Sequence, residues 1–217
     1  KTVIIGDQAG GSNMTGGGYA DGTVGIGFKS LEALTSGAGC IGIGHKALYQ
    51  HTTGHRNIAI GYGAGALTGG TNASTSADNL FIGHESGGGD WADATSTQNI
   101  GIGNYALDGV MNDSNWNTAV GYKAGTEMTT GDSNTLIGSS AGANVIDGDK
   151  NICIGESSGY YQINGDSNVY IGSSAGQGAS GYSTSNNVAI GMNALVAIDE
   201  GIYNVCVGNY AGDNITD

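Results

Sequence analysis

Proline is absent from this chain of 217 residues, cysteine occurs only three times, and positive charge is scarce. Six lysines and arginines stand against nineteen aspartates and glutamates, so the formal net charge is −13. Because phosphate groups repel an acidic surface, nucleic acid and anionic membrane surfaces are poor candidates for partners. Only 12 % of the residues are charged, and we interpret the acidity as a source of solubility.

Long apolar runs are also absent. No stretch of 18 consecutive apolar residues is available to span a membrane, so we expect no membrane insertion. The chain has neither a signal peptide nor an initiator methionine, and we expect it to be a segment of a longer fibrous protein. The cysteines lack the CxxC or cysteine–histidine spacing of zinc sites, and we expect no cofactor.

Glycine, in contrast, accounts for 43 residues, without the three-residue period of collagen. The nine-residue unit Asn57–Gly65 contains a glycine at position 61 that recurs in twelve similar units. These repeat glycines stand at positions 6, 27, 44, 61, 83, 103, 121, 138, 155, 172, 191 and 208. The short and nearly regular period is typical of a solenoid. We therefore predict one all-β repeat domain over residues 1–217, a parallel β-roll or β-solenoid of twelve coils.

The residues before each repeat glycine predict one short strand per coil. The position just before the glycine is Ile or Val in all twelve units, and the position three before it is apolar in ten. These two positions point to the same side of a strand, and we expect them to form the core of the solenoid. The position between them is never charged, and only Tyr170 carries a polar group there. We therefore expect a second dry face, which packs against other copies of the chain.

Three further columns of the internal alignment have a physical interpretation. Four residues before the glycine, nine of the twelve units have asparagine, and stacked asparagines are able to form a ladder of side-chain amides. Three residues after the glycine, every unit has Ala or Ser, which indicates a place too narrow for a larger side chain. The next position is Gly in eight units and Leu in four.

The columns resemble a known family of repeats. The segment Asn187–Ala194 (NVAIGMNA) is similar to the head repeat of the trimeric autotransporter adhesins, the YadA-like head. The segment Asn117–Gly125 (NTAVGYKAG) is similar to related repeats with longer loops in phage tail fibres. The resemblance implies a left-handed β-roll in which three chains pack around a common axis. The expected partners are therefore two further copies of this chain, which together form a homotrimer. The family repeat is about fourteen residues long, whereas the shortest interval here is 17, so we expect an additional outer loop in each coil.

Candidate receptor-binding residues lie in the polar outer segments, where aromatic rings are able to stack on sugars or anchor protein contacts. The candidates are Asp90, Trp91, Asp93, Tyr160, Tyr161 and Tyr182. The alternative interpretation is that these rings cap the outside of the coils or fill gaps between protomers.

Metal sites are weakly indicated. Asp132, Asp149 and Asp166 fall in one column of the most regular repeats, where we interpret them as turn residues, with a calcium or sodium ladder as the alternative. His45 and His84 each follow a repeat glycine. We interpret them as surface residues, with a metal cluster around a three-fold axis as the alternative.

These observations favour a non-enzymatic attachment module outside the cell, the shaft or receptor-contacting head of a phage tail fibre on the virion. Three chains would hold a host cell-surface glycan or protein through many weak contacts from their outer loops. One alternative is the head domain of a bacterial trimeric adhesin on the cell surface. A second is a glycan-cleaving tailspike, which would need paired acids in a groove.

Overall fold

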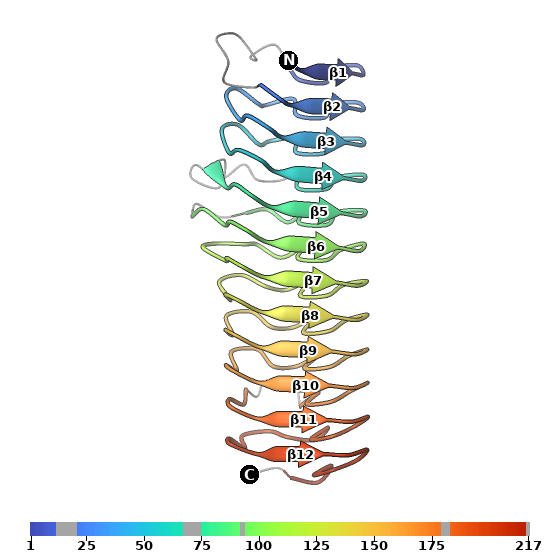
Figure 1. The fold of residues 1–217 in the computed structure, drawn as a ribbon, viewed down its shortest axis with the longest axis vertical. Coiled ribbons are helices and arrows are strands. Elements are labelled where there is room, and N and C mark those ends of the chain that lie inside the picture. The colour runs from blue at the N-terminus through green and yellow to red at the C-terminus, as the bar shows by residue number, and fades with distance from the viewer. Residues whose placement is uncertain (12–20, 67–74, 92–93, 179–182, 216–217) are drawn as a thin grey trace.

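The computed structural model describes residues 1–11, 21–66, 75–91, 94–178 and 183–215. Within these ranges the chain forms twelve three-residue strands and no α-helix. The strands stack in chain order into one parallel sheet along an elongated solenoid (Figure 1), which confirms the predicted fold class. The strands are β1 Val3–Ile5, β2 Val24–Ile26, β3 Ile41–Ile43, β4 Ile58–Ile60, β5 Leu80–Ile82, β6 Ile100–Ile102, β7 Thr118–Val120, β8 Thr135–Ile137, β9 Ile152–Ile154, β10 Val169–Ile171, β11 Val188–Ile190 and β12 Val205–Val207.

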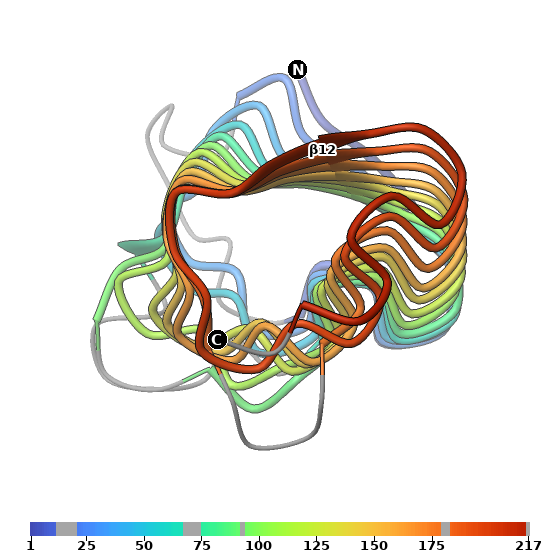
Figure 2. The same ribbon diagram turned by 90° about the horizontal axis from the view of Figure 1, so that it is seen from below.

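Equivalent residues of neighbouring coils lie opposite one another. In the pairing of β10 with β11, for example, Val169 lies opposite Val188 and Tyr170 lies opposite Ala189. The same register holds between β4 and β5, although the interval between their repeat glycines is the longest in the chain. Each column of the internal alignment is therefore a row of side chains along the solenoid. The end-on view in Figure 2 shows the coils following the same path at the sheet and at the corner after it, each slightly offset from the one before.

The middle residue of each strand lines the interior of the solenoid. Ala59, Phe81, Leu136 and Tyr170 are at most 1 % exposed. The residues on either side of them point outward and are half-buried or exposed. The expectation that these flanking residues form the core was therefore wrong. The middle residues form the core, and the flanking residues form the second apolar face, on the outside of the solenoid. Alternation determines which residues share a side but not which side is enclosed, and here both sides are apolar.

The interior is narrow, and each coil divides it between two positions. These are the middle strand residue and the fourth residue after the repeat glycine. Where Leu31, Leu48 and Leu107 occupy the second position, the strand of the same coil has Gly25, Gly42 and Gly101 in the first. All three leucines are at most 1 % exposed.

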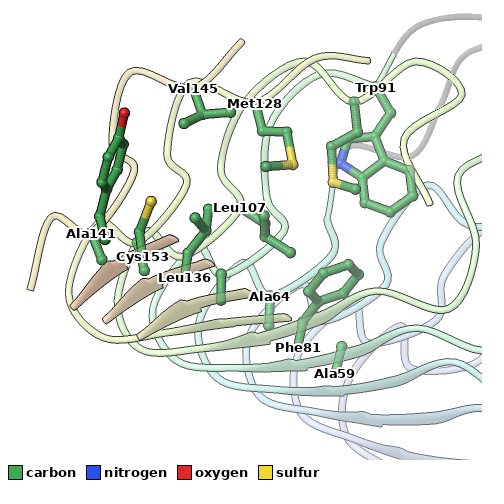
Figure 3. Close-up of a cluster of buried hydrophobic side chains, with 14 of the residues drawn as sticks. Ala59, Ala64, Phe81, Trp91, Leu107, Met128, Leu136, Ala141, Val145 and Cys153 are labelled. Carbon is green, nitrogen blue, oxygen red and sulfur yellow. The ribbon is translucent and has the colours of Figure 1, made fainter. Parts of the chain in front are cut away.

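The opposite arrangement occurs where the strand contributes a large side chain. A Cβ atom added at Gly87 would lie 2.5 Å from the ring of Phe81, and one at Gly142 would lie 2.6 Å from Leu136 Cδ2. Figure 3 shows Phe81, Leu107 and Leu136 together on the interior side of the sheet. In these coils the two positions therefore compensate for each other in size. The coils of β4 and β7 have small residues at both positions, and there larger side chains of the neighbouring coils reach into the space, at 3.0 Å (Leu48) from a Cβ atom added at Gly65 and at 2.8 Å (Leu136) from one added at Gly125.

The repeat glycine forms the corner after each strand. Gly61 has φ +141°, and a Cβ atom there would lie 2.2 Å from the carbonyl oxygen of Gly83 in the next coil, so no side chain fits. The narrow position three residues later holds buried alanines and serines such as Ala64 and Ser86, as predicted. These serines also satisfy backbone groups. Ser86 Oγ, for instance, donates a hydrogen bond to the carbonyl oxygen of Gly101 at 2.9 Å.

The predicted asparagine ladder is present and runs without a gap from Asn57 to Asn204. Asn134 illustrates its geometry. Its Nδ2 donates to Asn117 Oδ1 at 3.0 Å and to the carbonyl oxygen of Gly148 at 2.8 Å. Its Oδ1 accepts the backbone N–H and the side-chain amide of Asn151, at 2.9 and 3.1 Å. Each amide thus joins three coils at the start of the strands.

Candidate interaction surface

The outer face of the sheet carries a continuous aliphatic surface. We call the residues one and three positions before each repeat glycine the outer stripe. Twenty-two of its twenty-four members are Ile, Leu or Val, and the other two are Thr118 and Thr135. Ile137 and Ile190, inside the stack, are each 38 % exposed, and Val205 in the last coil is 72 % exposed. Contiguous apolar surface of this extent is typical of a protein–protein interface.

A row of aromatic and histidine rings runs along the corner that follows the strands, next to the outer stripe. We call these residues the corner ladder: Phe28, His45, Tyr62, His84, Tyr105 and Tyr122. The first four rings are stacked, with centroids 5.4, 4.5 and 5.2 Å apart along the row. The last two continue the row edge to face. The sequence carries a signal for this ladder, because five of the six rings directly follow a repeat glycine.

Lysines lie beside two rings of the corner ladder, although the chain has few positive charges: Lys29 Nζ is 5.7 Å from the centre of the Phe28 ring, and Lys123 Nζ is 5.6 Å from the centre of the Tyr122 ring. Lys29 and Lys46 place their Nζ atoms 5.5 and 5.2 Å from the centre of the Tyr49 ring. Lys29 also lies 3.2 Å from a carboxylate oxygen of Glu32. Among the described residues, no carboxylate lies within ion-pair distance of Lys46. The positive charge of Lys46 is thus without an acidic partner in the part of the chain that the structure describes.

The structure brings few of the predicted receptor-binding residues together. Trp91 lies in the core, 2 % exposed, with its ring edge-on to Phe81 at 5.6 Å between centroids, so it is not in an outer segment as we expected. Asp90, the preceding residue, is exposed. Tyr160 and Tyr161 are half-buried and contact each other edge to face at 4.6 Å. The remaining two candidates, Asp93 and Tyr182, lie outside the described residues.

The three stacked aspartates act on the backbone of the preceding coil. Asp132 Oδ1 accepts the backbone N–H of Asn115, Asp149 Oδ1 accepts that of Asp132 at 2.8 Å, and Asp166 Oδ1 accepts that of Asp149 at 2.8 Å. Partial burial raises the pKa of Asp132, and the neighbouring charge of Asp149 adds to this effect. This geometry supports the interpretation of the aspartates as turn residues. The described part of the chain contains no group of three or more His, Cys, Asp or Glu able to hold a metal ion.

Comparisons of the chain with family models, with curated proteins and with solved structures find no match. In the described ranges, no helix has the length and apolarity needed to cross a membrane. We therefore infer a function from the outer stripe and the corner ladder.

Proposed function

We propose that this chain is a trimeric attachment module, the shaft or receptor-contacting head of a phage tail fibre. The observation that carries the proposal is the outer stripe, which runs along the whole sheet without a charged residue. Three chains packed side by side around an axis parallel to the stripe would cover this surface. A closed cyclic assembly also ends growth, because every copy of the stripe is then occupied. The number three comes from the resemblance to trimeric head repeats.

The mechanism of attachment would be multivalent. Each chain presents loops of variable length on a rigid stack of coils, and three chains present the same loops at a fixed spacing. Weak contacts to a host cell-surface glycan or protein then add through avidity, and binding can exceed that of one chain by about 10²–10⁴-fold.

The first prediction is the mass in solution. Light scattering should give about three times the 21.6 kDa of one chain. Ile137→Asp should dissociate the trimer, because it buries a charge among apolar side chains of the neighbouring copies. The matched control is Ser139→Asp, which introduces the same charge at an exposed position two residues away but outside the outer stripe. A folded monomer in the unmodified chain would refute the proposal.

Attachment itself is measured with the fluorescently labelled chain on bacterial cells. The trimer should bind at least a hundred times more tightly than the Ile137→Asp monomer, since a monomer loses the gain from avidity. Equal binding by the two would contradict the multivalent mechanism and leave the outer stripe without this role.

A further inference from the structure

In one column of the repeat a single coil lacks a side chain, and this leaves a gap in the surface beside the corner ladder. The second residue after each repeat glycine has a left-handed backbone in all twelve coils, with φ between 51° and 63°. Eleven coils place a side chain there, and only the coil of β4 has glycine, at Gly63. Because Lys46, Glu85 and nine other residues adopt the same conformation, the backbone does not require glycine at this position. The missing side chain calls for another explanation.

The gap at Gly63 forms a surface depression of about 170 Å³ between three coils. Its lining consists of Lys46, Tyr62, Gly63, Ala66, Glu85 and Gly88. Lys46 and Glu85 belong to the same column as Gly63, one coil before it and one coil after it, so they border the depression with opposite charges. Tyr62, from the corner ladder, is 52 % exposed. Its ring is stacked between His45 and His84, which fixes its orientation.

We propose that this depression binds a single uncharged sugar unit of a surface glycan. A hydroxyl-rich ring is able to accept a hydrogen bond from Lys46, donate one to Glu85 and contact the edge of Tyr62. A carboxylate or phosphate ligand would meet Glu85 in a chain of net charge −13, and a cation would meet Lys46, which has no acidic partner among the described residues. The volume is below that of most ligand pockets, which favours one ring over an extended ligand.

This inference rests on the proposed attachment function and names the ligand class for one site on each chain. Three such sites on a trimer would supply the weak, repeated contacts that the mechanism needs.

The decisive variant is Gly63→Ser, which restores the side chain that the other coils have. The φ of +63° at Gly63 is close to the +55° of Ser140 in the same column, so the backbone already accepts serine. An added Cβ atom would lie 3.1 Å from Glu85 Cγ, part of a flexible side chain that is able to move. The substitution therefore narrows the depression at its centre and leaves the fold intact, and thermal unfolding and light scattering check that the variant is folded and assembled like the unmodified chain. Ser140→Ala changes the same column far from the depression and is the control.

The experiment is saturation-transfer NMR on the whole chain, with the methyl glycosides of glucose, galactose, mannose and N-acetylglucosamine as probes. Glucuronate and glucosamine serve as the charged comparisons. At least one neutral glycoside should bind, with an affinity reduced tenfold or more by Gly63→Ser and by Lys46→Met, and unchanged by Ser140→Ala. Binding that survives Gly63→Ser, a stronger signal from either charged sugar, or no signal from any neutral glycoside would overturn the proposal.

Glycoside binding and cell attachment, both measured on the unmodified protein, separate this proposal from the attachment function. If the unmodified trimer attaches to cells but none of the neutral glycosides binds, the sugar site is wrong and the attachment function stands. If a glycoside binds in the depression but the trimer does not attach to cells, the site stands and the attachment function is wrong.

Discussion

At the scale of single residues, buried asparagines connect the coils. The side chains from Asn57 to Asn187 are at most 2 % exposed. Every asparagine inside the row has hydrogen-bond partners within the protein for both side-chain amide hydrogens and for the side-chain carbonyl oxygen. A buried amide that loses its partners costs free energy in both coils that it joins, so the ladder specifies register as well as stability.

We expect Asn134→Ala to lower the free energy of unfolding by about 3 kcal/mol or more, because four hydrogen bonds are lost and partners in both neighbouring coils become unsatisfied. Asn204→Ala is the matched control. Asn204 ends the ladder, is only partly buried, and donates to Asn187 alone. Its loss should cost about 1 kcal/mol. Urea unfolding measures both values, and equal losses would show that the interior of the ladder has no special role.

His51 gives the stability a dependence on pH. The ring is 1 % exposed, with Nε2 at 2.9 Å from the carbonyl oxygen of Gly54 and 3.0 Å from Asn57 Nδ2. Burial lowers the pKa of His51 from 6.5 to about 4. Between these two values the unfolded chain binds the proton and the folded chain does not. The contribution of His51 is therefore complete above pH 6.5, and it is lost as the pH falls toward 4, with a total of roughly 3 kcal/mol.

The corresponding test compares urea unfolding at pH 7 and pH 4.5. The His51→Gln variant should lose less stability than the unmodified chain over this interval. Asp108→Asn tests the opposite effect on stability at pH 7. Burial raises the pKa of Asp108 to about 6, so the carboxylate is charged at pH 7 and destabilises the fold there. This second variant should be stabilised at pH 7. An unchanged acid loss in His51→Gln would exclude His51 as a source of the pH dependence.

At the scale of one coil, the core depends on the pair of positions that divide the interior. Leu136 and Gly142 form one such pair, and Gly101 with Leu107 forms the reverse arrangement two coils earlier. The chain thus already contains both solutions to the same packing problem. Exchanging one solution for the other within a coil conserves side-chain volume, which is the kind of core change that proteins tolerate best.

We expect Leu136→Gly to destabilise by about 4 kcal/mol through the cavity that it leaves. Gly142→Leu should cost about 2–3 kcal/mol through the clash with Leu136. The double variant should be more stable than either single variant, with a coupling energy on the order of 2 kcal/mol or more. Thermal unfolding of the four proteins provides the cycle. Additive losses would mean that the two positions do not share one space.

The coils also show what the sequence was able to predict. The strand positions, the corner glycines, the narrow Ala or Ser site and the asparagine ladder all followed from recurrence within the chain. The direction of the strand faces did not, because Ile and Val on one side and Ala, Phe or Leu on the other are both apolar. The compensation between Gly25 and Leu31, or between Phe81 and Gly87, was the available signal, since only residues that share an enclosed space need to compensate in size.

The candidate sites were harder to predict than the fold. Trp91 belongs to a long segment between two coils, and no periodicity determines whether such a segment folds inward or outward. Here the indole enters the core against Phe81. The depression at Gly63 was hidden for a different reason. It depends on the absence of one side chain between Lys46 and Glu85, and this absence has meaning only when neighbouring coils are known to be stacked.

At the scale of the whole molecule, the constant register of the strands makes the length of the rod independent of the length of the segments that connect its coils. The interval from Gly44 to Gly61 is among the shortest between repeat glycines, and the next one, from Gly61 to Gly83, is the longest. Both advance the stack by a single strand. An insertion in the connecting segment therefore changes neither the length of the rod nor the alignment of the outer stripe. The connecting segments are therefore free to vary coil by coil, while the face on which the proposed trimer packs keeps the same geometry.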